Sequence, residues 1–319
     1  MQTIFNPYLK ETIFFRPEQM YGENRRVFKE LPHIEDGNVY FIAERKRVRT
    51  IPESVQISDD GYISVSFLLG NGQKIPAKFP LASTIIDLGV MFKKLYLDDL
   101  NLQKYVKGVK DKVEYLSIQK KTHDLPFIGV SLDKDSQSKK NIALRIHTPD
   151  GQTGNLTLSI HSILSLFNID IGDYPHVIYI GKSEHLQDRI YRHERIQEAL
   201  AVIEDESDLY LYAFQFDAQK ITIPKFYEPR SSVRKTDVHD VSKSDQLALV
   251  EMGLINYFKP HLNEKFKHAE IPANPVFNDA LSTKYDQMVI EVDYESGFWN
   301  FGSDHIQSSL RHQIEYLVG

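Results

Sequence analysis

The sequence predicts an α+β protein built in three parts. Residues 1–150 are expected to form a β-rich domain, residues 151–268 a small three-stranded sheet flanked by helices, and residues 269–319 a short acidic extension. Three observations predict this division. Alternating apolar residues dominate the first part, the second has the order strand, helix, strand, loop, helix, and acidic residues gather in the third.

The N-terminal part is expected to contain a hairpin and further strands. Residues 63–67 alternate strictly, and Asn71-Gly72 then turns the chain into residues 74–79. An Asn-Gly pair between alternating segments favours a tight turn in which both residues adopt positive φ. The remaining expected elements are strands at 39–42, 126–132 and 141–147, a helix at 82–97 and a basic helix through 109. Residues 1–36 show no clear period, and the domain is either a nucleic-acid recognition module or a protein–protein module.

The middle part alternates strands and helices. Strands are expected at 156–160 and 177–180, and Ser183 stands where a helix N-cap would follow Gly181. Five apolar residues of that helix face a core, namely Leu186, Ile190, Ile196, Leu200 and Ile203. An aromatic strand at 209–216, a polar loop at 217–243 and a second helix, capped by Ser244 and ended by Pro260, complete the unit.

Charge and composition limit the class of protein. The net charge is −6, but residues 270–319 hold eight acidic and two basic residues, which leaves the rest of the chain neutral. Basic residues cluster at 45–49 and 104–121, either as phosphate-binding patches or as solvated faces. No apolar run is long enough to span a membrane and no signal peptide is visible, so no membrane partner is expected. The absence of cysteine excludes thiolate metal sites and favours a cytoplasmic location.

Glu251 is the first candidate for chemistry. It lies in the middle of an apolar helical stripe formed by Leu247, Leu254 and Phe258. A carboxylate in such a stripe is unfavourable unless it is paired, hydrogen-bonded or bound to a metal. The alternatives are a catalytic or metal-binding role, a structural salt bridge, or a place at the edge of a crevice.

The first helix and the strand before it carry further candidates. Arg189 and His193 are four residues apart and share a helical face, where an arginine can bind phosphate through two hydrogen bonds. Lys182 lies at the helix start, an unfavourable place for a cation unless it serves an anion. Tyr179 ends the strand. The structural alternatives are a surface arginine, a hydrogen-bonded histidine and a packing tyrosine.

These residues resemble the GIY-YIG endonuclease family. The run Tyr179-Ile180-Gly181-Lys182-Ser183 with Arg189 and His193 is similar to the second motif and first helix, and Glu251 with Asn263 is similar to the last motif. The resemblance covers residues of about 155–267. It implies a single Mg²⁺ or Mn²⁺ held by Glu251, an arginine, Arg189, that stabilises charge on the scissile phosphate, and Tyr179 as the base or its orienter. It further implies that Lys182 and His193 assist proton transfer or bind phosphate.

The first motif of the family, Gly-Ile-Tyr on the preceding strand, is not found just before Tyr179. Asn168 lies about eleven residues earlier, and Tyr174 is too close for a strand and turn to intervene. His161, at the end of the strand predicted at 156–160, is the candidate replacement. Nucleic acid is expected to contact Asn263 and four cations of the polar loop, Lys225, Arg230, Arg234 and Lys235.

The predicted function is therefore a metal-dependent endonuclease acting on DNA, in restriction or phage defence, with RNA as an open alternative substrate. One such site cuts one strand, so double-strand cleavage favours a homodimer. A second hypothesis is a catalytically impaired nucleic-acid-binding protein. A third is an interaction protein whose acidic tail is autoinhibitory.

Overall fold

The structure is a computed structural model. It describes residues 1–15, 38–59, 61–80, 129–147, 153–183, 185–186, 194–224, 232–293 and 300–318. The chain divides into two compact units. Unit 1 comprises Met1–Arg45, Tyr174–Glu295 and Trp299–Gly319, and unit 2 comprises Lys46–Asp173 and Ser296–Phe298.

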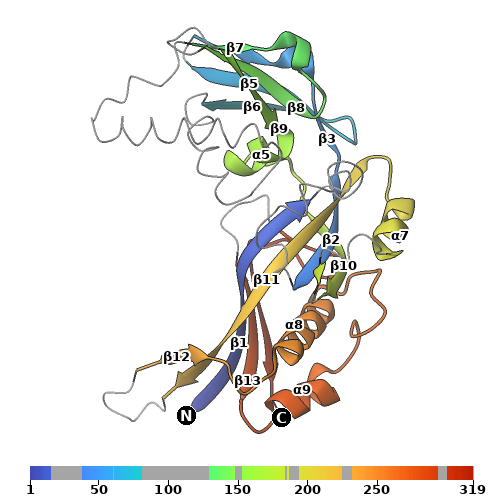
Figure 1. The fold of residues 1–319 in the computed structure, drawn as a ribbon. Helices are drawn as coiled ribbons and strands as arrows, with labels where there is room; N and C mark the ends of the chain where they lie inside the picture. The colour runs from blue at the N-terminus through green and yellow to red at the C-terminus, as the bar shows by residue number, and fades with distance from the viewer. Residues whose placement is uncertain are drawn as a thin grey trace. The chain divides into compact units, whose positions relative to one another are not determined.

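Unit 1 is built on one seven-stranded mixed sheet. The strands are β1 (Gln2–Phe15), β2 (Val39–Lys46), β10 (His176–Lys182), β11 (Ser207–Ile223), β12 (Arg234–Asp237), β13 (Gln287–Asp293) and β14 (Arg311–Leu317). Their order is β10-β2-β11-β1-β13-β14, with β12 also paired to β11. β1 runs parallel to β13 and antiparallel to β11, and the long β1 and β11 lie side by side in Figure 1.

Aromatic side chains fill the core of unit 1. Residues 209–216 form the buried half of β11, as their continuous apolar run predicts. The Phe41 ring packs edge-on against Phe214, Phe258 and Phe301, at centroid distances of 4.6, 5.6 and 5.5 Å. These four rings come from β2, β11, helix α8 and the segment before β14, so the core joins distant parts of the chain.

Three helices of unit 1 are described: α7 (Glu194–Val202), α8 (Lys243–Phe258) and α9 (Pro275–Leu281). α8 packs against β10 (Figure 1). Ser242, two residues before the predicted cap, accepts a hydrogen bond from the Asp245 amide at 3.1 Å and begins α8. Lys259 adopts φ 51° after the last turn, and Pro260 prevents the helix from continuing, as predicted.

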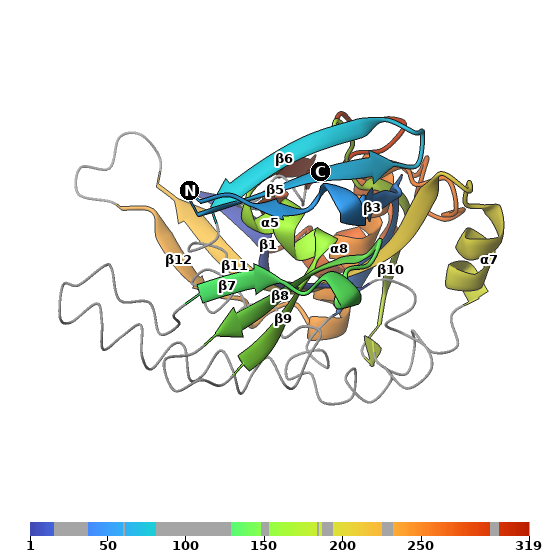
Figure 2. The same ribbon diagram turned by 90° about the horizontal axis from the view of Figure 1, so that it is seen from above.

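Unit 2 contains two small antiparallel sheets (Figure 2). One has β3 (Val48–Thr50), β4 (Gln56–Ile57), β5 (Tyr62–Leu69) and β6 (Lys74–Pro80). The other has β7 (Gly129–Leu132), β8 (Asn141–His147) and β9 (Thr153–Ser159), and helix α5 (Ile160–Leu166) follows. Short 3-10 turns occur at η3 (Pro52–Ser54) and η4 (Lys134–Ser136), and in unit 1 at η5 (Ile271–Ala273).

The β5–β6 hairpin is confirmed, but its turn differs from the prediction. Only Gly72 of the Asn-Gly pair has positive φ, 82°. The Gly72 amide donates to Leu69 O at 2.9 Å and the Leu69 amide to Gln73 O at 2.8 Å. The connection is therefore a three-residue loop and not the two-residue turn predicted. Its glycine occupies the left-handed position that is typical of three-residue hairpin loops.

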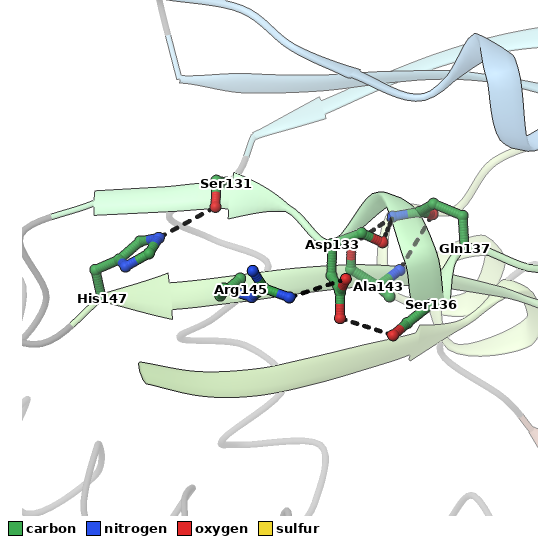
Figure 3. Close-up of polar contacts among 7 residues, drawn as sticks. All are labelled: Ser131, Asp133, Ser136, Gln137, Ala143, Arg145 and His147. Atoms are coloured by element: carbon green, nitrogen blue, oxygen red, sulfur yellow. Dashed lines mark hydrogen bonds and ion pairs between the residues drawn. The ribbon is translucent and has the colours of Figure 1, made fainter. Parts of the chain in front are cut away.

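A polar cluster closes the end of the β7–β8 sheet (Figure 3). The buried Asp133 carboxylate accepts hydrogen bonds from Ser136 Oγ at 2.7 Å and Arg145 Nη2 at 3.2 Å. The Ser136 hydrogen bond and the Arg145 charge lower the pKa of Asp133. Ser131 Oγ and His147 Nε2 lie 3.1 Å apart on the same pair of strands. These contacts link the turn after β7 to β8 and have a structural character.

The predicted fold class is wrong. Among the described residues 48% lie in strands and 21% in helices, and the architecture is a curled mixed sheet, not a small three-stranded sheet flanked by helices. The C-terminal residues are not an extension, because β13 and β14 are strands of the main sheet. β1 was missed because it lacks strict alternation, and part of the predicted loop at 217–243 is the β11–β12 pair. The polar residues of this predicted loop could not indicate that β11 and β12 pair there.

The other predicted strands are confirmed where they are described. The helices expected at 82–97 and through 109 lie outside the described residues. The predicted functional division at residues 150 and 268 stays a prediction.

Candidate functional site

A pocket of about 480 Å³ lies where the end of β10 meets α8 in unit 1. Residues after α8 and beside α9 complete its wall. Its lining residues are Tyr179, Lys182, Arg195, Ala248, Glu251, Met252, Ile255, Leu262, Asn263, Glu264, Lys265, Phe266, Asn274 and Val276. The pocket therefore gathers Tyr179, Lys182, Glu251 and Asn263, four of the predicted site residues.

Glu251 connects α8 to β10. Its stripe neighbours Leu247, Leu254 and Phe258 are buried as predicted, whereas Glu251 itself is half-buried. Glu251 Oε1 accepts a hydrogen bond from the Lys182 amide at 3.0 Å. This hydrogen bond orients the carboxylate at the end of β10, beside the pocket.

Asn263 fixes the other side of the pocket to the same strand. Its Nδ2 donates to Ile180 O at 2.8 Å, and its Oδ1 accepts from the Ile180 amide at 2.9 Å. The neighbouring Leu262 amide donates to Ile178 O at 3.0 Å. The buried side chain thus acts as a short piece of neighbouring strand along β10.

Tyr40, which the sequence reasoning missed, lies directly beside Tyr179. The strand that pairs with β10 is β2, with Tyr40 opposite Gly181, and the Tyr40 and Tyr179 ring centroids are 6.0 Å apart. A Cβ added to Gly181 would lie 2.5 Å from Tyr40 Oη, so only glycine allows the tyrosine to lie there.

Asn38 holds the start of β2 between its neighbours. Its side chain donates to Phe216 O and accepts from the Phe216 amide, both at 3.1 Å. Its carbonyl accepts from the Ser183 amide at 3.0 Å. Asn38 therefore joins β11, β2 and the end of β10, and it fixes the position of Tyr40 two residues later.

His161, the candidate replacement for the first-motif tyrosine, does not lie on β2, and neither does Asn168. Asn168 has φ 47° just after α5, where the Ile169 amide donates to Leu164 O at 3.0 Å, so it ends that helix. His161 lies buried within α5. Both belong to unit 2, whereas Tyr179 belongs to unit 1. The strand that carries Tyr40 was predicted, but no local signal in the sequence indicates that this strand pairs with β10.

Arg195 is a further pocket residue that the sequence reasoning missed. It lies in the first turn of α7. Its Nη1 is 2.6 Å from Glu198 Oε2, and its Nη2 is 3.6 Å from Glu264 Oε1. The hydrogen bond to Glu198 raises the pKa of Arg195, with smaller contributions from Glu264 and Tyr179. The guanidinium stays charged beside the pocket.

Four further predicted residues lie outside the described residues, namely Arg189, His193, Lys225 and Arg230. Arg234 and Lys235 are exposed on β12, opposite Thr222 and Ile221, and are not among the pocket residues.

The side chains of the pocket could bind a divalent ion in only one way, through a single carboxylate. Across the described ranges there is no group of three or more His, Asp or Glu side chains that could hold a metal. Mg²⁺ commonly binds through one or two carboxylates, with waters and substrate phosphate oxygens completing its shell. Glu251, half-buried in a pocket with room for water and a phosphate, fits that mode.

The chain matches no protein-family model and no curated protein. In the part of the chain that the structure describes, none of the helices combines the length and apolarity needed to cross a bilayer.

Proposed function

We propose that this pocket hydrolyses phosphodiester bonds in DNA with the help of a divalent metal ion, as an endonuclease. The observation that carries the proposal is the convergence of Tyr179, Lys182, Glu251 and Asn263 on one pocket. Two separate sequence blocks, residues 179–182 and 251–263, supply them.

The pairing of β2 with β10 supports the resemblance to the GIY-YIG endonucleases. Asn38-Val39-Tyr40 is similar to the Gly-Ile-Tyr motif of the family and stands on the strand beside Tyr179-Ile180-Gly181. Unit 2 separates the two motifs in sequence. The proposal concerns the motif residues and their chemistry, and it does not require the small three-stranded domain.

The residues of the pocket can each be given a separate chemical role. Tyr179, with Tyr40 at its side, would orient the attacking water and, as a phenolate, would accept its proton. Lys182 and Arg195 line the same pocket, and with Arg189 they would stabilise negative charge on the phosphate. Glu251 would hold Mg²⁺ or Mn²⁺, and the bound ion would supply further positive charge at the phosphate oxygens.

The alternatives receive less support. A catalytically impaired DNA-binding protein would not need Glu251 and Tyr179 in one pocket. An autoinhibitory acidic tail is disfavoured because the C-terminal residues supply β13 and β14 of the sheet. Restriction or phage defence as the biological setting, and a homodimer that cuts both strands, stay predictions.

The test is relaxation of supercoiled plasmid by the full-length protein with Mg²⁺ or Mn²⁺. We expect nicked or linear product that EDTA abolishes and that Arg189→Ala suppresses. Cleavage that persists in EDTA would contradict the metal-dependent mechanism. A parallel assay on RNA of the same sequence separates the two substrates.

A further inference from the structure

We propose that the pocket also holds one unpaired nucleobase against the ring of Phe266, next to the phosphodiester bond. This inference rests on the proposed function, because it assigns a second substrate contact to the same pocket. It makes Phe266 a positioning residue that selects nucleotides presented outside a double helix.

The pocket wall combines polar and apolar residues. Tyr179, Lys182 and Glu251 are among the polar ones, and Met252, Ile255 and Phe266 are among the apolar ones. A hydrated metal ion and a phosphate need only the polar groups. Apolar lining together with convergent polar groups is typical of a site for an organic ligand.

Phe266 adopts an unusual backbone conformation. Its φ is 65°, in the left-handed region that glycine occupies without steric penalty and that is rare for a bulky side chain. Such outliers concentrate at functional sites, where surrounding contacts maintain them. Glycine would be the least strained residue at this position, so packing of the turn alone does not explain the aromatic ring.

Hydrogen bonds from α8 maintain this conformation. Asn256 Nδ2 donates to Phe266 O at 3.0 Å and to Ala269 O at 2.9 Å. Tyr316 Oη on β14 in turn donates to Asn256 Oδ1 at 3.1 Å. The loop that carries the half-exposed Phe266 is therefore fixed to the core, and the ring is pre-positioned at the pocket wall.

The cations of the pocket indicate the class of ligand. Lys182, Arg195 and Lys265 line the same pocket as Phe266. An aromatic ring for a base together with cations for the flanking phosphates is the arrangement by which proteins bind single-stranded nucleic acid. A base within a duplex is stacked and cannot reach the ring, so the bound base must be single-stranded or flipped out.

The test compares two ligands that differ only in their bases. One is a fluorescently labelled single-stranded oligothymidylate, and the other is an abasic strand of the same length and charge. Binding to the full-length protein is followed by fluorescence anisotropy in EDTA, so that no cleavage occurs. The wild type should bind the oligothymidylate about 5- to 150-fold more tightly, the range that stacking of one base gives.

Substitutions at Phe266 separate stacking from folding. Phe266→Gly removes the ring and suits the left-handed backbone, so we expect no loss of Tm, while the preference for the oligothymidylate falls to about onefold. Phe266→Trp should keep the preference, and Phe266→Leu should lose most of it. Binding of the abasic strand should stay unchanged in all three.

Each outcome decides the inference. A wild type with no preference for bases, no binding of either strand, or a preference that survives in Phe266→Gly would overturn it. Plasmid cleavage without a base preference would contradict base binding at Phe266 but leave the endonuclease proposal intact. A base preference without plasmid cleavage would contradict the endonuclease proposal but leave base binding at Phe266 intact.

Discussion

At the candidate site, the side chain of Tyr40 packs directly against the backbone of Gly181. Gly181 has no Cβ, and the space that a Cβ would need is occupied by Tyr40 Oη and Cζ, 2.5 and 2.6 Å from its position. Tyr40, buried on β2, and the half-exposed Tyr179 on β10 therefore form one unit beside the Lys182 amide and Glu251.

Removing either hydroxyl tests that unit. We predict that Tyr179→Phe and Tyr40→Phe each lower the cleavage rate by about 10²- to 10⁴-fold, the range for a positioned acid or base. Far-UV circular dichroism and Tm should change little, because the rings stay in place. Tyr62→Phe in unit 2 is the control and should keep the wild-type rate, whereas a wild-type rate in Tyr179→Phe would remove the tyrosine from the mechanism.

At this scale the sequence predicted the residues that one helix or one strand defines. The apolar stripe around Glu251 follows from local periodicity, whereas Tyr179 and Lys182 were selected by their resemblance to a family motif, and the pocket contains all three residues. Tyr40 could not be predicted, because its position depends on a strand pairing across unit 2. Arg195 was missed because nothing in its local pattern distinguishes it from a surface arginine.

Two asparagine clamps hold the elements of the site together. Asn38 bridges β2 to β11, and Asn263 pairs with the Ile180 backbone on β10. Each side chain makes both hydrogen bonds that a neighbouring strand would make. The elements themselves were predicted from pattern, but these joints depend on tertiary contacts that no local rule contains.

We predict that Asn263→Ala destabilises the protein, because both buried polar groups of Ile180 lose their partners. The free energy of unfolding, measured with urea, should fall by between about 1 and about 3 kcal/mol for each group left unsatisfied. Asn155→Ala, at an exposed position on β9, is the matched control and should change stability by less than about 0.5 kcal/mol. Equal effects at the two positions would show that the clamp contributes nothing.

His312 joins β14 to α8 and should make stability depend on pH. Its ring lies between Tyr257 Oη and Phe301 O, both at 3.2 Å, and burial lowers the pKa of His312 below its ordinary value of 6.5. A depressed histidine pKa means that the unfolded chain binds a proton more readily than the folded one. Stability is therefore fully present above pH 6.5 and is lost as the pH falls towards the folded-state pKa.

We predict that the urea midpoint falls between pH 7.5 and pH 5 in the wild type, and by less in His312→Gln. His261→Gln, which changes an exposed histidine, should keep the wild-type difference. If His312→Gln and the wild type lose the same stability, another group causes the pH dependence.

In the sequence of the whole molecule, unit 2 is inserted between β2 and β10, two strands that pair in unit 1. β2 and β10 are antiparallel neighbours, and Glu44 pairs with His176 close to the points where the chain leaves and re-enters unit 1. A short turn could therefore replace the insertion without separating the strands. Among the described strands, sequence patterns predicted three of the seven in unit 1 and five of the seven in unit 2. They did not predict the order of the unit 1 sheet, whose neighbouring strands come from both ends of the chain.

We predict that a variant with a short glycine-containing turn in place of residues 46–173 folds cooperatively and retains metal-dependent plasmid cleavage. Deletion of residues 269–319 should instead abolish folding, because it removes two strands of the main sheet. Circular dichroism and urea titration measure both results. A folded protein after the C-terminal deletion would contradict the sheet order.

The central claim is that Glu251 carries the metal-dependent chemistry, and one matched comparison tests it most directly. Glu251 and Glu264 line the same pocket, but Glu264 is 85% exposed at its rim. In single-turnover plasmid cleavage with Mg²⁺, Glu251→Gln, which keeps an oxygen for the Lys182 amide, should lower the rate at least about 10²-fold. Glu264→Gln should cut at a rate close to that of the wild type, and cleavage by Glu251→Gln at the same rate as Glu264→Gln would contradict the account.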